Sequence, residues 1–189
     1  IDLRSEREEY GARASVMHTS KGGLFTFTAN VAPRIIYRDN ADWGVFKDAI
    51  EANPTTPLMD PENPARYYNF MGQVVGSNPV ERQKLEQDHA DTKLLDWDAT
   101  VKLNLLPLLA KEGKSNHRLT TQLMFADHQY SNDNTWFRPS TSTIAINNGR
   151  EGEASRSYSK ERQQIMEWLT NYSGSFGQHN VKVMAGYSY

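Results

Sequence analysis

Paired carboxylates are the first residues in this sequence whose type and spacing could perform chemistry. Asp96 and Asp98 stand two positions apart, and Asp127 and Asp133 form a second, looser pair. Cleavage of a glycosidic bond needs two placed carboxylates, and nothing in the sequence selects any two of these. Residues two apart on a strand project from the same face, where Asp96 and Asp98 would join Lys102. We therefore interpret these acids as a solvated polar face and expect no catalytic residues and no enzymatic activity.

The histidines could hold a metal only if some of them stood close together. Zinc motifs place their ligands within a few positions of one another, and these histidines do not show that spacing. The sequence contains no cysteine, which removes thiolate metal sites and disulfides. No nucleotide-binding loop or nucleophile elbow occurs, so we expect surface histidines and no cofactor. The histidines are His18, His89, His117, His128 and His179.

Aromatic residues in polar connections are the best candidates for ligand binding. They occur in contexts such as "SNDNTWFRP", where flat rings lie beside Asn and Asp. Such rings could stack on a sugar, and we predict a ligand-binding role for them, with packing inside the loops as the alternative. These candidates are Trp43, Tyr67, Tyr68, Trp136 and Phe137.

The composition narrows the class of protein. The chain has 189 residues and a net charge of -2, which gives no reason to expect a nucleic-acid partner. Mean hydropathy is -0.72, and no apolar run approaches the roughly 20 residues of a membrane-spanning helix. Low hydropathy would usually mean a soluble protein. The strands of a transmembrane barrel alternate apolar and polar residues, however, so low hydropathy is compatible with such a barrel.

Alternation of apolar and polar residues predicts the strands. The clearest example is "DWDATVKLNL", which places Trp97, Val101 and Leu103 on one face and polar residues on the other. Five other stretches alternate in the same way, and "TSKGG", "LPLLAKEGKSN" and "GQHN" would join them as antiparallel hairpins. We predict a mainly β protein built of sequential hairpins. The six strands are expected at about 9–17, 24–32, 94–105, 117–130, 163–176 and 179–189.

Two long connections are expected between the hairpins, at about 33–90 and 131–162. Most of the prolines fall in the first, a density that sheet interiors do not accept. Inside it, "NADWGVFKDAIEANP" predicts a short helix capped by Asn40 or Asp42 and ended by an Asn-Pro pair. The stretch "NPVERQKLEQ" is compatible with a second helix opened by Asn78, or with an irregular path to the next strand.

Short turns on one side and long connections on the other favour a partial transmembrane β-barrel. A soluble β-sandwich that binds carbohydrate is the alternative, favoured by the aromatic residues of the connections and by the low hydropathy. A sandwich would more often have short strands joined by turns of similar length at both ends. In the barrel interpretation the apolar faces contact lipid and the polar faces line the lumen. The aromatic residues expected at lipid or at its interface are Trp97, Phe125, Trp168, Tyr172, Tyr187 and Tyr189.

Four ordered motifs resemble one family of outer-membrane proteins. The stretches "EYGARASVMHTSKGGLFTFTANVAPR", "AIEANPTTPLMDPENPARYYN", "NPVERQ" and "FGQHNVKVMAGYSY" are similar to the early barrel region of SusC/RagA-type TonB-dependent transporters. The resemblance spans most of the chain. It implies a plugged barrel of about 22 strands in the cell outer membrane, which imports glycans, oligosaccharides or peptides.

The resemblance also implies partners. They are a SusD/RagB-like surface lipoprotein, the TonB complex, membrane lipid, and the imported oligosaccharide or peptide. The aromatic residues of the long connections could then contact the plug or the lipoprotein instead of ligand. The sequence starts at Ile1 and stops within a strand pattern, and it carries no signal peptide, energy-coupling box or plug domain. We therefore expect a fragment that does not perform transport by itself.

Overall fold

The protein is described here by a computed structural model that covers residues 5–106 and 116–189. Strand accounts for 60% of the structure and helix for 12%, which confirms the predicted mainly β fold. The strands are β1 (Glu6–Gly11), β2 (Ala14–Thr19), β3 (Phe25–Asp39), β4 (Gln87–Asn104), β5 (His117–Pro139), β6 (Gly152–Phe176) and β7 (His179–Ser188). The helices are α1 (Gly44–Glu51), α2 (Pro79–Leu85) and α4 (Thr143–Asn147).

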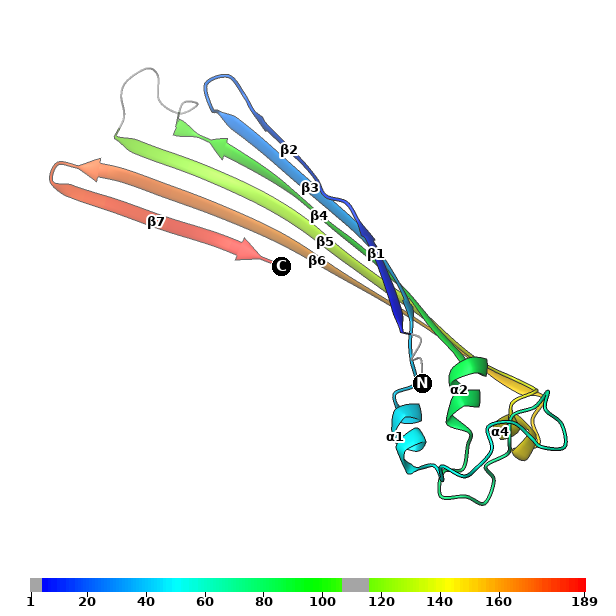
Figure 1. Ribbon diagram of the computed structural model, residues 1–189. Coiled ribbons are helices and arrows are strands. Elements are labelled where there is room, and N and C mark those ends of the chain that lie inside the picture. The colour runs from blue at the N-terminus through cyan, green and yellow to red at the C-terminus, as the bar shows by residue number, and fades with distance from the viewer. Residues whose placement is uncertain (1–4, 107–115) are drawn as a thin grey trace. The chain divides into compact units, whose positions relative to one another are not determined.

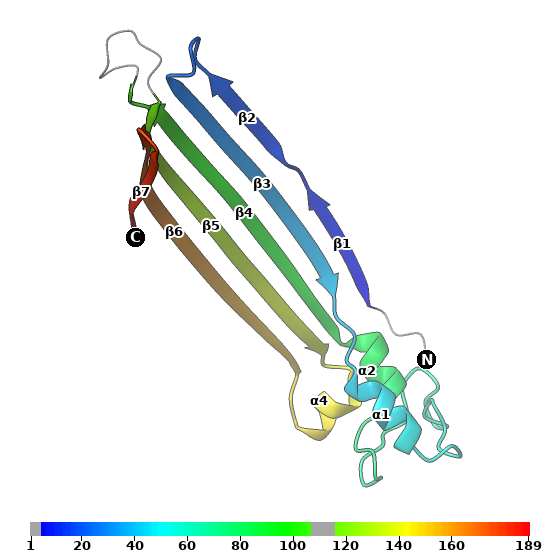
Figure 2. The same ribbon diagram turned by 90° about the vertical axis from the view of Figure 1, so that its left-hand side faces the viewer.

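The strands form one antiparallel sheet that is not closed. Its order is β1-β3-β4-β5-β6-β7, with β2 also paired to β3, so every strand from β3 onward lies beside its neighbour in sequence (Figures 1 and 2). The last hairpin pairs Phe176 with His179 across the two residues Gly177 and Gln178. Gly177 has φ 60°, the positive value that a tight hairpin turn of this kind requires.

The first predicted strand, at about 9–17, is interrupted. In the structure β1 and β2 follow one another along β3, with a break at residues 12 and 13. Ala14 pairs with Val31, and the amide of Ala12 donates to the carbonyl of Pro33 at 3.1 Å. Pro33 has no backbone N–H with which to donate a hydrogen bond back to Ala12, so the ladder lacks one hydrogen bond at the break. Pro33 is therefore accepted inside β3, where a connection was predicted.

Both predicted long connections are shorter than expected. The connection expected at about 33–90 spans 40–86 between β3 and β4, and the one expected at about 131–162 spans 140–151 between β5 and β6. The residues at the ends of these expected connections do not alternate in polarity, but they belong to strands in the structure. Pairs of polar side chains on neighbouring strands stabilise the sheet there. Arg156, for example, donates to Asp133 at 2.9 Å.

Side-chain hydrogen bonds from nearby residues support the start of two of the described helices. Asn78 opens α2 by accepting from the amides of Val80 and Glu81 at 3.1 and 3.3 Å, so the second helix considered from the sequence exists. The predicted first helix also exists as α1, with Asp42 accepting from the amide of Gly44 at 2.8 Å just before it. The sequence pattern did not predict α4. None of the helices in the described parts of the chain is long and apolar enough to cross a membrane.

The chain divides into two compact units that differ in how they bury apolar residues. The first unit contains residues 35–92 and 131–159 together with a short piece before Tyr10, and the second contains the rest of the described chain. Every buried apolar side chain in the described ranges belongs to the first unit. The second unit thus has strands without a buried apolar core of its own. The buried apolar residues are Ile36, Ala41, Val45, Phe70, Val75, Ala90 and Ala145.

Candidate ligand-binding cavity

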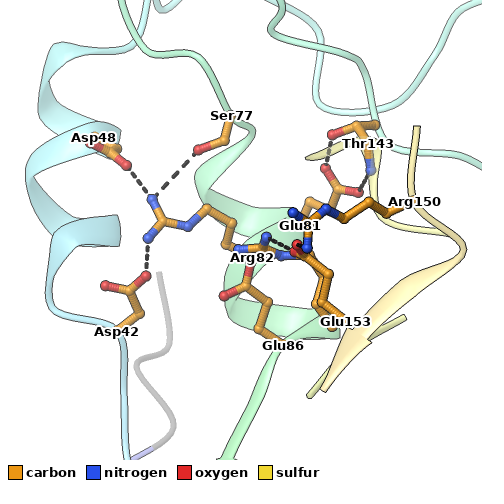
Figure 3. A network of polar contacts seen from close by, with 10 residues as sticks. Asp42, Asp48, Ser77, Glu81, Arg82, Glu86, Thr143, Arg150 and Glu153 are labelled. Carbon is orange, nitrogen blue, oxygen red and sulfur yellow. Dashed lines mark hydrogen bonds and ion pairs between the residues drawn. The ribbon is translucent and has the colours of Figure 1, made fainter. Parts of the chain in front are cut away.

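The helices of the first unit are joined by a polar network around Arg82 (Figure 3). Arg82 of α2 pairs with Asp42, which precedes α1, and donates to Asp48 within α1 at 2.5 Å. Its side chain is only 18% exposed, so this guanidinium is screened from water and held between two carboxylates. An arginine fork that bridges two carboxylates fixes geometry more tightly than a single exposed ion pair. The network therefore fixes α1 against α2.

A second buried contact fixes α4. The carboxylate of Glu81, 1% exposed, accepts from the amide of Thr143 at 2.5 Å and from its hydroxyl. The side chain of Ser142, the residue before α4, makes no capping hydrogen bond. Glu81 therefore supplies from α2 the acceptor that the first turn of α4 needs. This explains why the local sequence did not predict α4.

The network borders a cavity of about 780 Å³ that lies within the first unit. Trp43 and Trp136, two of the predicted ligand-binding residues, both line this cavity. They come from segments far apart in the sequence, the approach to α1 and the outer part of β5. The remaining lining is polar or charged apart from Ala41 and Gly44. It comprises Asp39, Asn40, Asp42, Arg82, Gln83, Lys84, Glu86, Gln87, Asp88 and His89.

Trp136 is held in place by a cation. The guanidinium carbon of Arg138 lies 4.8 Å from the centre of the Trp136 ring, a cation–π distance. Arg138 in turn donates to Glu86 at 2.8 Å and to Glu153 at 2.5 Å, and Glu153 also pairs with Arg150 at 2.8 Å. The ring is therefore positioned by a chain of ion pairs.

His89 lines the cavity and contacts two carboxylates through its ring nitrogens. Its Nδ1 lies 2.6 Å from Asp39 of β3, and its Nε2 lies 2.9 Å from Asp91 of β4. The hydrogen bond to Asp39, with the charge of Asp91, raises the pKa of His89 above its ordinary value, although partial burial opposes the shift. His89 thereby connects two neighbouring strands at the edge of the cavity.

The other three predicted ligand-binding residues do not line the cavity. Tyr67 and Tyr68 belong to a folded connection, in which the amide of Tyr68 donates to Leu58 at 3.0 Å. The side chain of Asn78 also donates to the carbonyls of Leu58 and Tyr68. These two tyrosines have surroundings typical of loop packing. Phe137 is 44% exposed and is not part of the cavity lining.

The paired acids are not brought together as pairs. Asp98 accepts from Asn30 at 2.8 Å, Asp96 contacts His128, and Asp133 accepts from Arg156. Asp127 was interpreted as part of a solvated face, but it is 1% exposed, because Arg162 and Gln164 cover its carboxylate. Each acid thus has its own partner. Within residues 5–106 and 116–189 no group of three or more His, Asp or Glu side chains could hold a metal ion.

The carboxylates in the cavity lining all have partners. Asp42, Asp39 and Glu86 are held by Arg82, His89 and Arg138 respectively. Asp88 accepts from the side-chain amide of Asn40 at 3.1 Å. No hydroxyl or thiol side chain is among the cavity's lining residues. Two indole rings beside amides and paired charges suit a ligand that has flat faces and many hydroxyl groups. The polar lining was missed in the sequence, where Asp39, Asp88 and His89 were not connected with the tryptophans.

The second unit has an apolar face, defined here by contacts between its aromatic side chains. The rings of Trp97 and Phe125 lie 5.3 Å apart, and His117 lies 6.1 Å from Tyr172 and 4.9 Å from Phe176. Trp168 is 53% exposed and stands directly opposite Tyr187 in the β6–β7 ladder. Trp97 thus lies beside Phe125, and Trp168 beside Tyr187, as expected for residues that share one face. No apolar side chain on it is buried among the described residues.

A scan against known protein families gives no match to this chain, and a search of curated proteins gives none. The functional interpretation therefore depends on the residues and geometry described above.

Proposed function

We propose that this chain is part of the barrel of a TonB-dependent outer-membrane transporter of the SusC/RagA type. The observation that carries the proposal is the apolar face of the second unit, which consists of alternating strand residues and has no buried core behind it. Burial of apolar area is the main stabilising term in a soluble domain. A sheet that leaves this area uncovered needs another apolar environment, and lipid hydrocarbon is the one that alternating strands fit.

The extent of the apolar face supports a membrane-crossing role. On β5 it runs over residues 117–125, close to the roughly 9–11 residues that a tilted strand needs to cross a bilayer. Two residues further on the same side comes Asp127, with Arg162 and Gln164 on the neighbouring strand. A charged cluster of this kind is costly in hydrocarbon but favourable at the aqueous boundary. The same face therefore changes from apolar to charged where a membrane interface would lie.

The soluble sandwich is the less favoured function. A sandwich buries its apolar faces between two packed sheets, whereas the strands of the described ranges belong to a single sheet. In the transporter interpretation the cavity of the first unit captures an oligosaccharide or peptide through Trp43 and Trp136. Such a protein acts together with a surface lipoprotein and draws its energy from the TonB complex.

Cysteine labelling of the membrane-inserted protein tests this proposal. The sequence contains no cysteine, so each substitution introduces a unique thiol. Thr100→Cys, on the polar face of β4, should react with a membrane-impermeant maleimide, and Val101→Cys on the apolar face should not. Lys21→Cys, in the turn between β2 and β3, is the positive control. Reaction at position 101 but not at 100 would reverse the two faces, and equal reaction at both would exclude lipid contact.

A further inference from the structure

A second hollow lies in the second unit, lined mainly by strand residues that alternate with those of the apolar face. It encloses about 400 Å³ and is lined from four neighbouring strands, β4, β5, β6 and β7. It contains none of the residues that line the cavity beside Trp43 and Trp136. Tyr172, Val183 and Met184 contribute to its lining, and the hydroxyl of Tyr172 is already engaged with His117. The other lining residues, all charged or hydrogen-bonding, are Lys102, Arg118, Thr120, Asn171, Ser173 and Lys182.

The hollow has three positive charges and no carboxylate in its lining. The three cations Lys102, Arg118 and Lys182 form no ion pair with any residue in the described part of the chain. The acids of β4 on this side have other partners, since Asp98 accepts from Asn30 and Asp96 contacts His128. Like charges that face one volume repel each other, so the hollow is a local positive site in a chain of net charge -2.

The strand ladder brings these groups within reach of one ligand. Four adjacent strands span three spacings of about 4.8 Å, which is about 14 Å in all. Lys102 and Lys182 stand on the two outer strands, with Arg118 on β5 between them. Ser173 is directly opposite Lys182 in the ladder, and Thr120 and Asn171 add neutral donors. Long cationic side chains therefore surround a centre lined with short hydrogen-bonding side chains.

We propose that this hollow binds a small multivalent anion, a compound with two or more phosphate or carboxylate groups close together. Charge-assisted hydrogen bonds to phosphate or carboxylate are the strongest that lysine and arginine make, and three cations match more than one anionic group. The volume lies near the lower end of the roughly 300–1,000 Å³ typical of small-molecule sites. That size favours a compact anion over a protein segment. The inference goes beyond the proposed transport function and depends only on the second unit.

Pyrophosphate is the probe for the test. It is titrated into the purified protein in a neutral detergent at low salt, and binding is followed by phosphorus NMR. We expect saturable binding that weakens as sodium chloride is raised. Lys102→Gln, Arg118→Gln and Lys182→Gln should each weaken binding by about tenfold, the loss expected for one hydrogen bond between charged groups. Circular dichroism of each variant verifies that the sheet is retained.

Lys21→Gln is the matched control, because it removes one positive charge from the turn before β3 and lies outside the hollow. It should leave pyrophosphate affinity unchanged. If Lys21→Gln and the three lining variants weakened pyrophosphate binding equally, the proposed site would be overturned. Such a result would show that the protein's overall charge, and not the hollow, attracts pyrophosphate. Absence of saturable binding by the unaltered protein would also overturn it. So would tight binding of a poly-glutamate peptide without any binding of pyrophosphate, which would identify a protein segment as the occupant.

Discussion

The two tryptophans of the cavity differ in what each one's removal would disturb. Trp136 is half-buried beneath Arg138, whose ion pairs extend to Glu86 and Glu153. Replacing Trp136 would therefore disturb the surrounding network as well as any ligand. Trp43 is 71% exposed, and its indole has a free surface at the cavity. Trp43 is thus the cleaner probe of ligand binding.

Trp43→Ala should weaken ligand capture and leave folding intact. Loss of one stacking face is worth about 0.5–1.5 kcal/mol by analogy with aromatic pairs, which corresponds to a decrease in affinity of about two- to tenfold. Affinity electrophoresis in gels that contain soluble oligosaccharides measures the change. Phe137→Ala is the control, since Phe137 is exposed but lies outside the cavity lining. Equal losses in both variants would show that the cavity is not the binding site.

His89 should make stability depend on pH in a defined direction. Its pKa is raised, chiefly by the hydrogen bond to Asp39. The contribution of protonated His89 to the free energy of unfolding is therefore fully present below pH 6.5, about the ordinary pKa of histidine. It is lost as the pH rises through the raised pKa. The melting temperature of the unaltered protein should exceed that of His89→Gln below this value, and the difference should shrink at higher pH.

His179→Gln is the control for this experiment. His179 is the first residue of β7 and is exposed, so its replacement measures the effect of losing a surface imidazole alone. A difference between the unaltered protein and His89→Gln that grows with pH would contradict the assigned sign.

Sequence reasoning at this scale identified the tryptophans but not their surroundings. An aromatic residue among Asn and Asp is visible in the sequence, and Trp43 and Trp136 were chosen for that reason. The same rule also selected Tyr67, Tyr68 and Phe137, which do not line the cavity. What distinguishes them is tertiary: the buried Asn78 holds the backbone of Tyr68, and Arg138 holds Trp136. Such long-range partners leave no local pattern.

At the scale of the elements, the break between β1 and β2 is explained by the missing amide hydrogen of Pro33. Pro33 accepts from Ala12 but has no N–H with which to donate back. The edge of the sheet is interrupted at that point, whereas β3 itself continues to Asp39. A proline that would end a central strand is tolerated here because its missing donor faces the interrupted edge.

Pro33→Ala should therefore join β1 and β2 into one strand. The new amide can donate to the carbonyl of Ala12. Amide hydrogen exchange at residues 12 and 13 should become slower than in the unaltered protein, and the new amide of residue 33 should itself exchange slowly. The overall change in stability should be small, because the added hydrogen bond, about 1 kcal/mol, is offset by the greater freedom of the unfolded chain without proline.

Pro57→Ala is the control for hydrogen exchange, since Pro57 lies in the connection between β3 and β4. It should leave exchange at residues 12 and 13 unchanged. Fast exchange at these positions in Pro33→Ala would mean that the interruption has another cause, such as the conformation of Arg13.

Elements were predictable where polarity alternates and were misjudged where it does not. The strand that contains Trp97 and the final hairpin were identified from alternation. The outer parts of β5 and β6 were assigned to a connection, because they are predominantly polar and contain charged residues such as Asp133 and Arg156. In the structure these charges pair across strands. A pattern that compares each residue only with its sequence neighbours cannot detect such pairing.

At the scale of the whole chain, the two units differ in which side chains they bury. The first unit buries apolar side chains and surrounds them with ion pairs, as a soluble domain does. The second unit leaves its apolar face exposed and buries polar groups such as Asp127. Mean hydropathy averages over both, which explains why a value of -0.72 did not distinguish a soluble protein from one that meets lipid.

The order of strands in the sheet also bears on how quickly the chain can assemble. From β4 to β7 each strand pairs only with its sequence neighbours. The strands are long, however, so most contacts join residues that are far apart along the chain, a topology associated with slower folding. The last hairpin closes a loop of two residues, whereas pairing β3 with β4 must first bring together the ends of the segment 40–86. The entropy lost on closing a loop grows only slowly with its length. Early folding of α1 and α2 through Arg82 would shorten that loop, and the ion pairs of Arg82 would then act on the rate of strand pairing as well as on the final fold.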